Sequence, residues 1–280
     1  MAYGNITLTS GMRQNLVSLQ KTNSLMELTQ TRLASGKKVN TALDDPVKYF
    51  AALGHTNRAN DLALRKSEMG EAIQTIKAAN NGIEAISALI DSAKSTAQSA
   101  LAIDATTTTT ATAYGQRSAL LLQFETLRSQ IDDLATDAGY KGTNFLQQAT
   151  LVVDFHETSG ESTLTISGFD GDTSGLSIAS GTDVWVEDAD VTAAITDLDN
   201  AKVELRTQAQ SPSNALSTIT TREDFTNNMI NTLEDGASAL VNADMNEEGA
   251  NMLMLQTRQA LGTTSLSLAS QAAQSVLRLF

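Results

Sequence analysis

Apolar residues spaced by seven at both ends of the chain constrain its fold more than any other feature. Met12, Leu19, Met26 and Leu33 form one such series, and Leu16 follows Met12 by four residues. On a helix this spacing gives a narrow apolar seam, the pattern of a coiled coil. The last forty residues carry similar seam positions, which are Met245, Met252, Leu261, Leu266, Leu268, Ala273, Val276 and Phe280. We expect the terminal helices to pack against each other and against other copies of the chain.

Composition narrows the classes of protein to consider. The 280 residues include 4% aromatic side chains and no cysteine, which suits long helices and excludes disulfides. There is no run of eighteen apolar residues, so no transmembrane helix is expected, and residues 1–30 lack the apolar core of a secretory signal. The net charge of −13 comes mainly from residues 151–200, which hold eleven acids and no Lys or Arg. Such a block is typical of a solvated surface and argues against nucleic-acid binding.

Local signals divide the rest of the chain into helices. Gly36 predicts a helix end, and Asp44 or Asp45 caps a new helix with Pro46 at its first position. Three further helical patterns follow, and Pro212 should kink or break the last of them. A surface turn is expected at residues 106–110. The apolar positions that define these patterns are Met69, Ile73, Ile76, Ile83, Ile90, Ala97 and Leu101, then Leu120, Phe124, Leu127, Ile131 and Leu134, then Val191, Ile195, Leu198, Leu205, Ile219, Ile230, Leu233, Ala237 and Leu240.

Residues 140–189 are the non-helical part of the prediction. Short β-prone runs at residues 151–156 and 163–166 flank a turn signal and indicate a hairpin, and residues 176–185 extend this β region. The expected fold is mainly α, an elongated antiparallel helical bundle or coiled coil with paired terminal helices and a small β-hairpin region. Its expected parts are a terminal coiled coil (1–42 and 241–280), a helical bundle (43–139 and 190–240) and a surface tip (140–189).

No catalytic constellation is present, so we expect neither an enzyme nor a bound cofactor. His55 and His156 lie outside any metal-ligand spacing, and a surface or core role is the simpler interpretation. Asp170 and Asp172 could ligate calcium, but the remaining ligands of a calcium loop are missing, and an Asp/Gly turn explains them better. A receptor or sensor with a coiled-coil stalk is a further alternative. It would need a transmembrane segment, and the sequence predicts none.

Four separated stretches read as motifs. They are LTQTRLASGKKVNTALDDP at residues 28–46, YKGTNFL at 140–146, ADMNEEGANMLMLQTRQALG at 243–262 and QAAQSVLRLF at 271–280. All four resemble conserved stretches of the bacterial flagellins. Their order matches that family, and together they reach both ends of the chain. The positions that carry the resemblance are Arg32, Gly36, Asn40, Asp44, Asp45, Asn144, Ala243, Asp244, Asn251 and Gly262.

The resemblance implies a structural subunit that self-assembles into the flagellar filament, the helical propeller for swimming motility. A hook–filament junction protein of the same family is the alternative. The implied partners are other flagellin copies, the type III export apparatus of the flagellum, a cytoplasmic export chaperone, the filament cap and the junction proteins. The implied location is extracellular, after secretion, without membrane insertion or nucleic acid. About fifty residues separate the third and fourth helical patterns, so large outer domains should be absent.

Two further expectations come from the resemblance. Surface loops of flagellins are often O-glycosylated, and the candidate hydroxyl groups are those of Thr158, Ser159, Ser162, Thr163, Thr173, Ser174 and Ser177. Animal Toll-like receptors detect an arginine-bearing segment on the second long helix of many flagellins. Here Ala88 and Ile90 replace the arginines and Ser92 replaces a leucine, so we expect weak detection.

Overall fold

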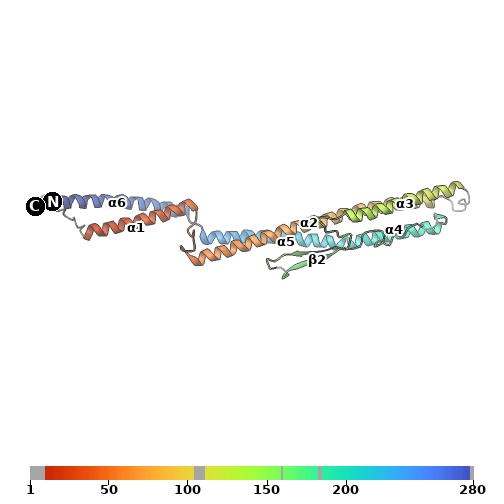
Figure 1. The fold of residues 1–280 in the computed structure, drawn as a ribbon, viewed down its shortest axis with the longest axis horizontal. Helices are drawn as coiled ribbons and strands as arrows, with labels where there is room; N and C mark the ends of the chain where they lie inside the picture. The colour runs from red at the N-terminus through yellow and green to blue at the C-terminus, as the bar shows by residue number, and fades with distance from the viewer. Residues whose placement is uncertain (1–9, 104–110, 159, 182–184, 278–280) are drawn as a thin grey trace, which may run out of the picture. The chain divides into compact units, whose positions relative to one another are not determined.

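The structure, a computed structural model, describes residues 10–103, 111–158, 160–181 and 185–277 (Figure 1). The expected turn at residues 106–110 lies outside this part of the chain. The described elements are α1 (Ser10–Ser35), α2 (Pro46–Leu101), α3 (Ala111–Asp137), β1 (Thr150–Asp154), β2 (Thr163–Ser167), α4 (Asp188–Gln208), α5 (Gln210–Val241) and α6 (Met245–Leu277). Within the described residues, no helix is long and apolar enough to cross a bilayer.

The chain divides into two compact units. Unit 1 combines residues 1–58 with residues 231–280, and unit 2 comprises residues 59–230. α2 and α5 each contribute residues to both units. The mainly helical fold with one small antiparallel sheet is the fold class that the sequence predicts.

In unit 2, α2, α3 and α4 share one apolar core. The predicted seam of α2 is buried along its whole length, from Met69 and Ile76 to Ile90 and Ala97. Phe124 on α3 and Leu198 on α4 are both fully buried in the same core as Ile90. Heptad spacing therefore identified the inner face of these helices correctly.

The β-hairpin of unit 2 covers a second core on α2 and α5. β1 and β2 pair antiparallel with Thr150 opposite Ser167 and Asp154 opposite Thr163. Val153 and Ile166 point into a buried cluster with Met69 and Ile219, while Val152 is 57% exposed. The predicted hairpin is confirmed. Residues 168–181 contain turns and no strand, so the expected β structure over 176–185 is wrong for its described part.

The second row of the α2 seam differs from the prediction. Leu101 is 39% exposed, and the buried row consists mostly of alanines, which are Ala72, Ala79, Ala93 and Ala100, with Ile86 between them. Small side chains bring neighbouring helices close together, and alanine carries too weak an apolar signal to stand out in a sequence. The predicted break near Pro212 is confirmed, because α4 ends at Gln208 and α5 begins at Gln210.

A buried arginine ties the start of α3 to the segment before α4. The Arg117 side chain is fully buried and donates to the carbonyl oxygens of Ile103 (Nε, 3.1 Å), Trp185 (Nη1, 3.1 Å) and Val186 (Nη1, 3.3 Å). It also pairs with the Asp188 carboxylate. These bonds satisfy carbonyl groups that lie outside regular structure, and burial makes each of them costly to lose. This role of Arg117 is not predicted from the sequence, because a lone arginine is usually a surface residue.

Replacing Arg117 tests this role. Arg117→Met keeps the volume but leaves three carbonyl groups and one carboxylate without their donor, so we expect a loss of about 3–5 kcal/mol in the free energy of unfolding. Urea denaturation followed by the fluorescence of Trp185, the single tryptophan of the chain, measures it. The exposed Arg206 supplies the control variant Arg206→Met. Equal unfolding midpoints for the two variants would refute the role of Arg117.

Candidate assembly interface

α1 and α6 of unit 1 pack side by side as an antiparallel pair (Figure 1). Along each helix, shielded residues recur at alternating steps of three and four, the spacing of a two-stranded coiled coil. On α1 they are Met12, Asn15, Leu19, Thr22, Met26, Thr29 and Leu33. On α6 they are Glu248, Met252, Leu255, Gln259, Gly262, Leu266, Ala269 and Ala273.

Polar contacts fix the register of this pair. Asn15 Nδ2 donates to Ser265 Oγ at 2.9 Å, and Gln259 Nε2 donates to Asn23 Oδ1 at 3.0 Å. At the other end, Arg32 Nη1 pairs with Glu248 Oε1 at 3.1 Å, and the Glu248 side chain is only 5% exposed. A shift by one turn would leave these groups unpaired within the interface, which is how polar seam residues select one register.

A glycine brings the two helices together near the middle of α6. A Cβ atom at Gly262 would lie 2.5 Å from Leu19 Cδ1, well inside van der Waals contact. Leu19 therefore occupies the space that any larger residue at position 262 would need. Gly262 is one of the positions that carry the family resemblance, and this packing gives a physical reason for a glycine there.

Four predicted seam residues are exposed and are not shielded by the partner helix. Leu16 is 40% exposed, Met245 is 48% exposed, Leu261 is 67% exposed and Leu268 is 62% exposed. Spacing by seven defines an apolar stripe but not the direction it faces, and α6 carries two stripes at that spacing. Burial of this second stripe against other copies stays a prediction. The Val276 side chain and Phe280 lie outside the described residues.

Several signature residues build the connection between α1 and α2. Gly36, with φ +69°, ends α1 in the left-handed conformation that favours glycine, and its N–H donates to Arg32 O at 2.8 Å. Its carbonyl oxygen accepts from the N–H of Ala243 at 2.9 Å, and Lys37 forms a β-bridge with Asn242. These backbone bonds join the end of α1 to the segment between α5 and α6.

Two acidic signature residues shape the turn before α2. Asp44 Oδ2 accepts from the N–H groups of Asn40 (3.0 Å) and Thr41 (2.9 Å), and these bonds lower the pKa of the Asp44 carboxyl group. Asp45 Oδ1 caps α2 by accepting from the N–H of Lys48 at 3.1 Å. Asn40 Nδ2 donates to Lys37 O at 3.2 Å.

The other signature residues also lie at helix ends or in the paired helices. Asp244 Oδ1 caps α6 by accepting from the N–H of Asn246 at 2.8 Å. In unit 2, buried Asn144 donates to Ala135 O (2.8 Å) and Thr136 O (2.9 Å), and so satisfies carbonyl groups at the end of α3. Asn251 is half-buried on α6.

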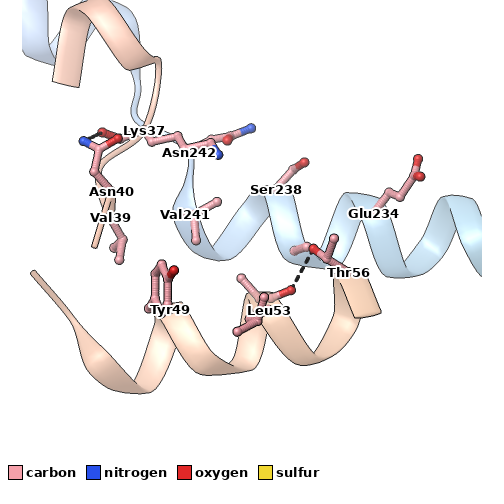
Figure 2. Close-up of a pocket in the computed structure, with 12 residues that line it drawn as sticks. Lys37, Val39, Asn40, Tyr49, Leu53, Thr56, Glu234, Ser238, Val241 and Asn242 are labelled. Carbon is pink, nitrogen blue, oxygen red and sulfur yellow. Dashed lines mark hydrogen bonds between the residues drawn. The ribbon is translucent and has the colours of Figure 1, made fainter. Parts of the chain in front are cut away.

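A cleft of about 470 Å³ lies beside this connection in unit 1. Figure 2 shows Tyr49 and Leu53 pointing from α2 toward α5, with Lys37 near one end of the group and Glu234 near the other. Leu53 is 41% exposed, and the neighbouring Phe50 on α2 is 61% exposed. No local sequence pattern predicts this cleft, because it forms only when residues 37–56 meet residues 234–242.

The structure sorts the other candidate residues by exposure. Ile90 is 1% exposed in the core of unit 2, so it cannot occupy a receptor-facing position, whereas Ala88 and Ser92 are exposed. Thr173 is also buried, and its Oγ1 donates to Asp132 Oδ2 at 3.1 Å, which excludes it as a sugar acceptor. Thr158, Thr163, Ser174 and Ser177 are exposed, Ser162 is half-buried, and Ser159 lies outside the described residues. Glycosylation stays a prediction.

The described residues of the two units form no recognisable catalytic centre. Among the described residues, no three His, Cys, Asp or Glu side chains gather as metal ligands would. Unit 1 is nearly neutral, because its nine Lys and Arg residues against eight Asp and Glu residues give a net charge of +1. The total charge of the chain is −13, so unit 2 has a net charge of −14. The described features of unit 1 are therefore helix pairing, capped turns and exposed apolar side chains, all suited to protein–protein contact.

Two family models match the chain. The model described as the bacterial flagellin N-terminal helical region matches residues 8–150, which include α1, α2 and α3. The model described as the bacterial flagellin C-terminal helical region matches residues 189–280, which include α5 and α6.

Individual relatives align over the same extent. Flagellin FljM of Caulobacter vibrioides is 28% identical over 280 residues and covers 100% of both chains. Flagellin C of Rhizobium meliloti is 25% identical and a flagellin of Brucella melitensis is 26% identical, each covering 95% of both chains. The N-terminal family model alone spans more than half of the residues, and the chain therefore belongs to the bacterial flagellin family.

Proposed function

We propose that this chain is a structural subunit that self-assembles into the bacterial flagellar filament, the helical propeller for swimming. The observation that carries the proposal is the second apolar stripe of α6, formed by Met254, Leu261 and Leu268. Leu261 borders α1 beside Leu19, yet most of its side chain stays uncovered. Met254 is 52% exposed, and the two leucines are more exposed still. A row of this kind on a helix already paired elsewhere is typical of a surface that another protein covers.

The partner that fits this stripe is another copy of the chain. A helical filament grows by heterologous contacts, in which one surface of a subunit meets a different surface of the next. Unit 1 has such surfaces, because α6 presents its stripe while Val17 on α1 and Phe50 on α2 are also more than 60% exposed. The division into a terminal coiled coil, a helical bundle and a hairpin tip is part of the same proposal.

An enzymatic function has no support, and the flagellin family is structural. The alternative within the family, a hook–filament junction protein, is not better supported, since relatives named flagellin align over the full length of the chain. We extend the proposal to an extracellular location and to transient partners: the export apparatus, a cytoplasmic chaperone, the filament cap and the junction proteins. The exposed stripe supports the chaperone, because uncovered apolar surface promotes aggregation before export.

Two aspartate substitutions separate pairing within the chain from assembly between chains. Leu268→Asp should leave the α1–α6 pair intact, because Leu268 is exposed, yet block filament growth by placing a carboxylate in the contact between copies. Leu19→Asp should disrupt both the α1–α6 pair and filament growth, since Leu19 packs against Gly262. Circular dichroism of the monomer and sedimentation after seeding with filament fragments measure the two effects.

The exposed Ser267 supplies the matched control, Ser267→Asp, which adds the same charge one residue away from the stripe. We expect this control to sediment as the unaltered chain does. Filaments of normal length from Leu268→Asp would contradict the role of the stripe.

The exposed face of α2 that carries Ala88 and Ser92 is the region where animal Toll-like receptors would recognise this chain. Ala88 and Ser92 offer no guanidinium group on this face, and arginine is enriched among residues that dominate interface affinity. Loss of such an anchor typically costs about 2 kcal/mol, or roughly thirtyfold in affinity. We therefore propose that the monomer is a weak agonist of this receptor.

A reporter-cell assay with disaggregated monomer tests this proposal. Ala88→Arg should increase potency, whereas Thr126→Arg, at an exposed position of α3, should not. Unaltered chain that matches an arginine-bearing flagellin in potency would show that the anchor is dispensable.

A further inference from the structure

The cleft of unit 1 is a second surface that this chain leaves uncovered. Val39, Tyr49, Leu53 and Val241 supply most of its apolar lining, from the α1–α2 connection, α2 and α5 (Figure 2). Its volume of about 470 Å³ could receive several side chains of a helix laid across it. The apolar lining continues onto α2, where Val47 is 79% exposed and Phe50 is 61% exposed.

Opposite charges mark the two ends of this cleft. Glu234 lines it from α5, is exposed, and has no ion-pair partner within 4 Å among the described residues. Lys37 lines the opposite end, as Figure 2 shows. The two ends therefore attract opposite charges, and a docking helix that carries a single cation would prefer one direction over the other.

The second stripe of α6 has the matching pattern. Met254, Leu261 and Leu268 recur at intervals of seven, and Arg258 lies between the first two. Arg258 is exposed and is the single charged residue of α6 after Glu248, and it borders α1 together with Leu261. An exposed apolar row with one cation thus lies on the same unit that holds an apolar cleft with one unpaired carboxylate.

We propose that the α6 stripe of one copy docks in the unit 1 cleft of a second copy, with Arg258 beside Glu234. This inference rests on the proposed self-assembly and names the two surfaces that meet. Because the stripe and the cleft are different surfaces of one chain, their contact is heterologous, and a row of docked copies keeps one free stripe at one end and one free cleft at the other. A filament can therefore grow through this contact when successive copies do not close into a ring.

Charge reversal tests the docking directly. Glu234→Arg places two cations together, and Arg258→Glu places two carboxylates together, so each single variant should raise the concentration needed for seeded growth about tenfold or more. The double variant Glu234→Arg/Arg258→Glu restores an opposite pair and should return growth toward that of the unaltered chain. Sedimentation after seeding with the variant's own fragments gives the comparison.

Neighbouring residues supply matched controls. Asp235→Arg makes the same reversal one residue away on α5, outside the cleft lining, and Gln256→Glu adds an acid on α6 near Arg258. Both should grow as the unaltered chain does. Two outcomes would overturn the docking, provided that the unaltered chain grows. One is a single reversal that grows as well as the unaltered chain, and the other is a double variant that fails as the single variants do. Failure of the unaltered chain to grow would instead overturn the proposed function.

Cysteine cross-linking supplies a measurement that does not depend on a loss of growth. The chain contains no cysteine, so Leu53→Cys and Leu261→Cys can be placed in separate preparations and mixed. Oxidation of the mixed filament should join residue 53 of one copy to residue 261 of another, as mass spectrometry would detect. Filaments that form normally but yield no such cross-link would refute the contact.

Discussion

The antiparallel packing of α1 against α6 is the contact on which the rest of unit 1 depends. An isolated helix is marginal in water, and each of these two helices gains its main cover from the other. Arg32 and Glu248 close one end of the pair, while Gly262 admits Leu19 near the middle. The turns that follow α1 and precede α6 then join through backbone bonds between Gly36 and Ala243. If the pair forms in another register, these bonds lose their geometry.

The pairing also explains why α6 has two apolar stripes. One faces α1 and holds the chain together, and the other, at Leu261 and Leu268, remains exposed. A subunit of a filament needs both kinds of surface, since it must hold its own shape and also bind identical neighbours. The near neutrality of unit 1 supports close contact between copies, whereas the charge of −14 on unit 2 suits a surface in water.

The sequence predicted most helices, the hairpin and the helix caps, because heptad spacing, Pro46 and Gly36 act locally. It did not predict which α6 stripe faces α1, because that choice depends on Asn23 and Gln259 meeting across the interface. Polar seam residues such as Thr22 and Thr29 were missed because they interrupt an apolar series. The cleft and the buried Arg117 depend on segments distant in sequence, so no local pattern announces them.

The register of the α1–α6 pair is the central claim, and cross-linking tests it most directly. In this cysteine-free chain, Asn15→Cys and Ser265→Cys replace side chains whose polar atoms lie 2.9 Å apart. Assembled filaments from mixed isotopically labelled and unlabelled chains should, on oxidation, give a disulfide within single chains in high yield. Mixed disulfides between labelled and unlabelled chains in the share expected for links between copies, or no disulfide at all, would contradict the paired arrangement.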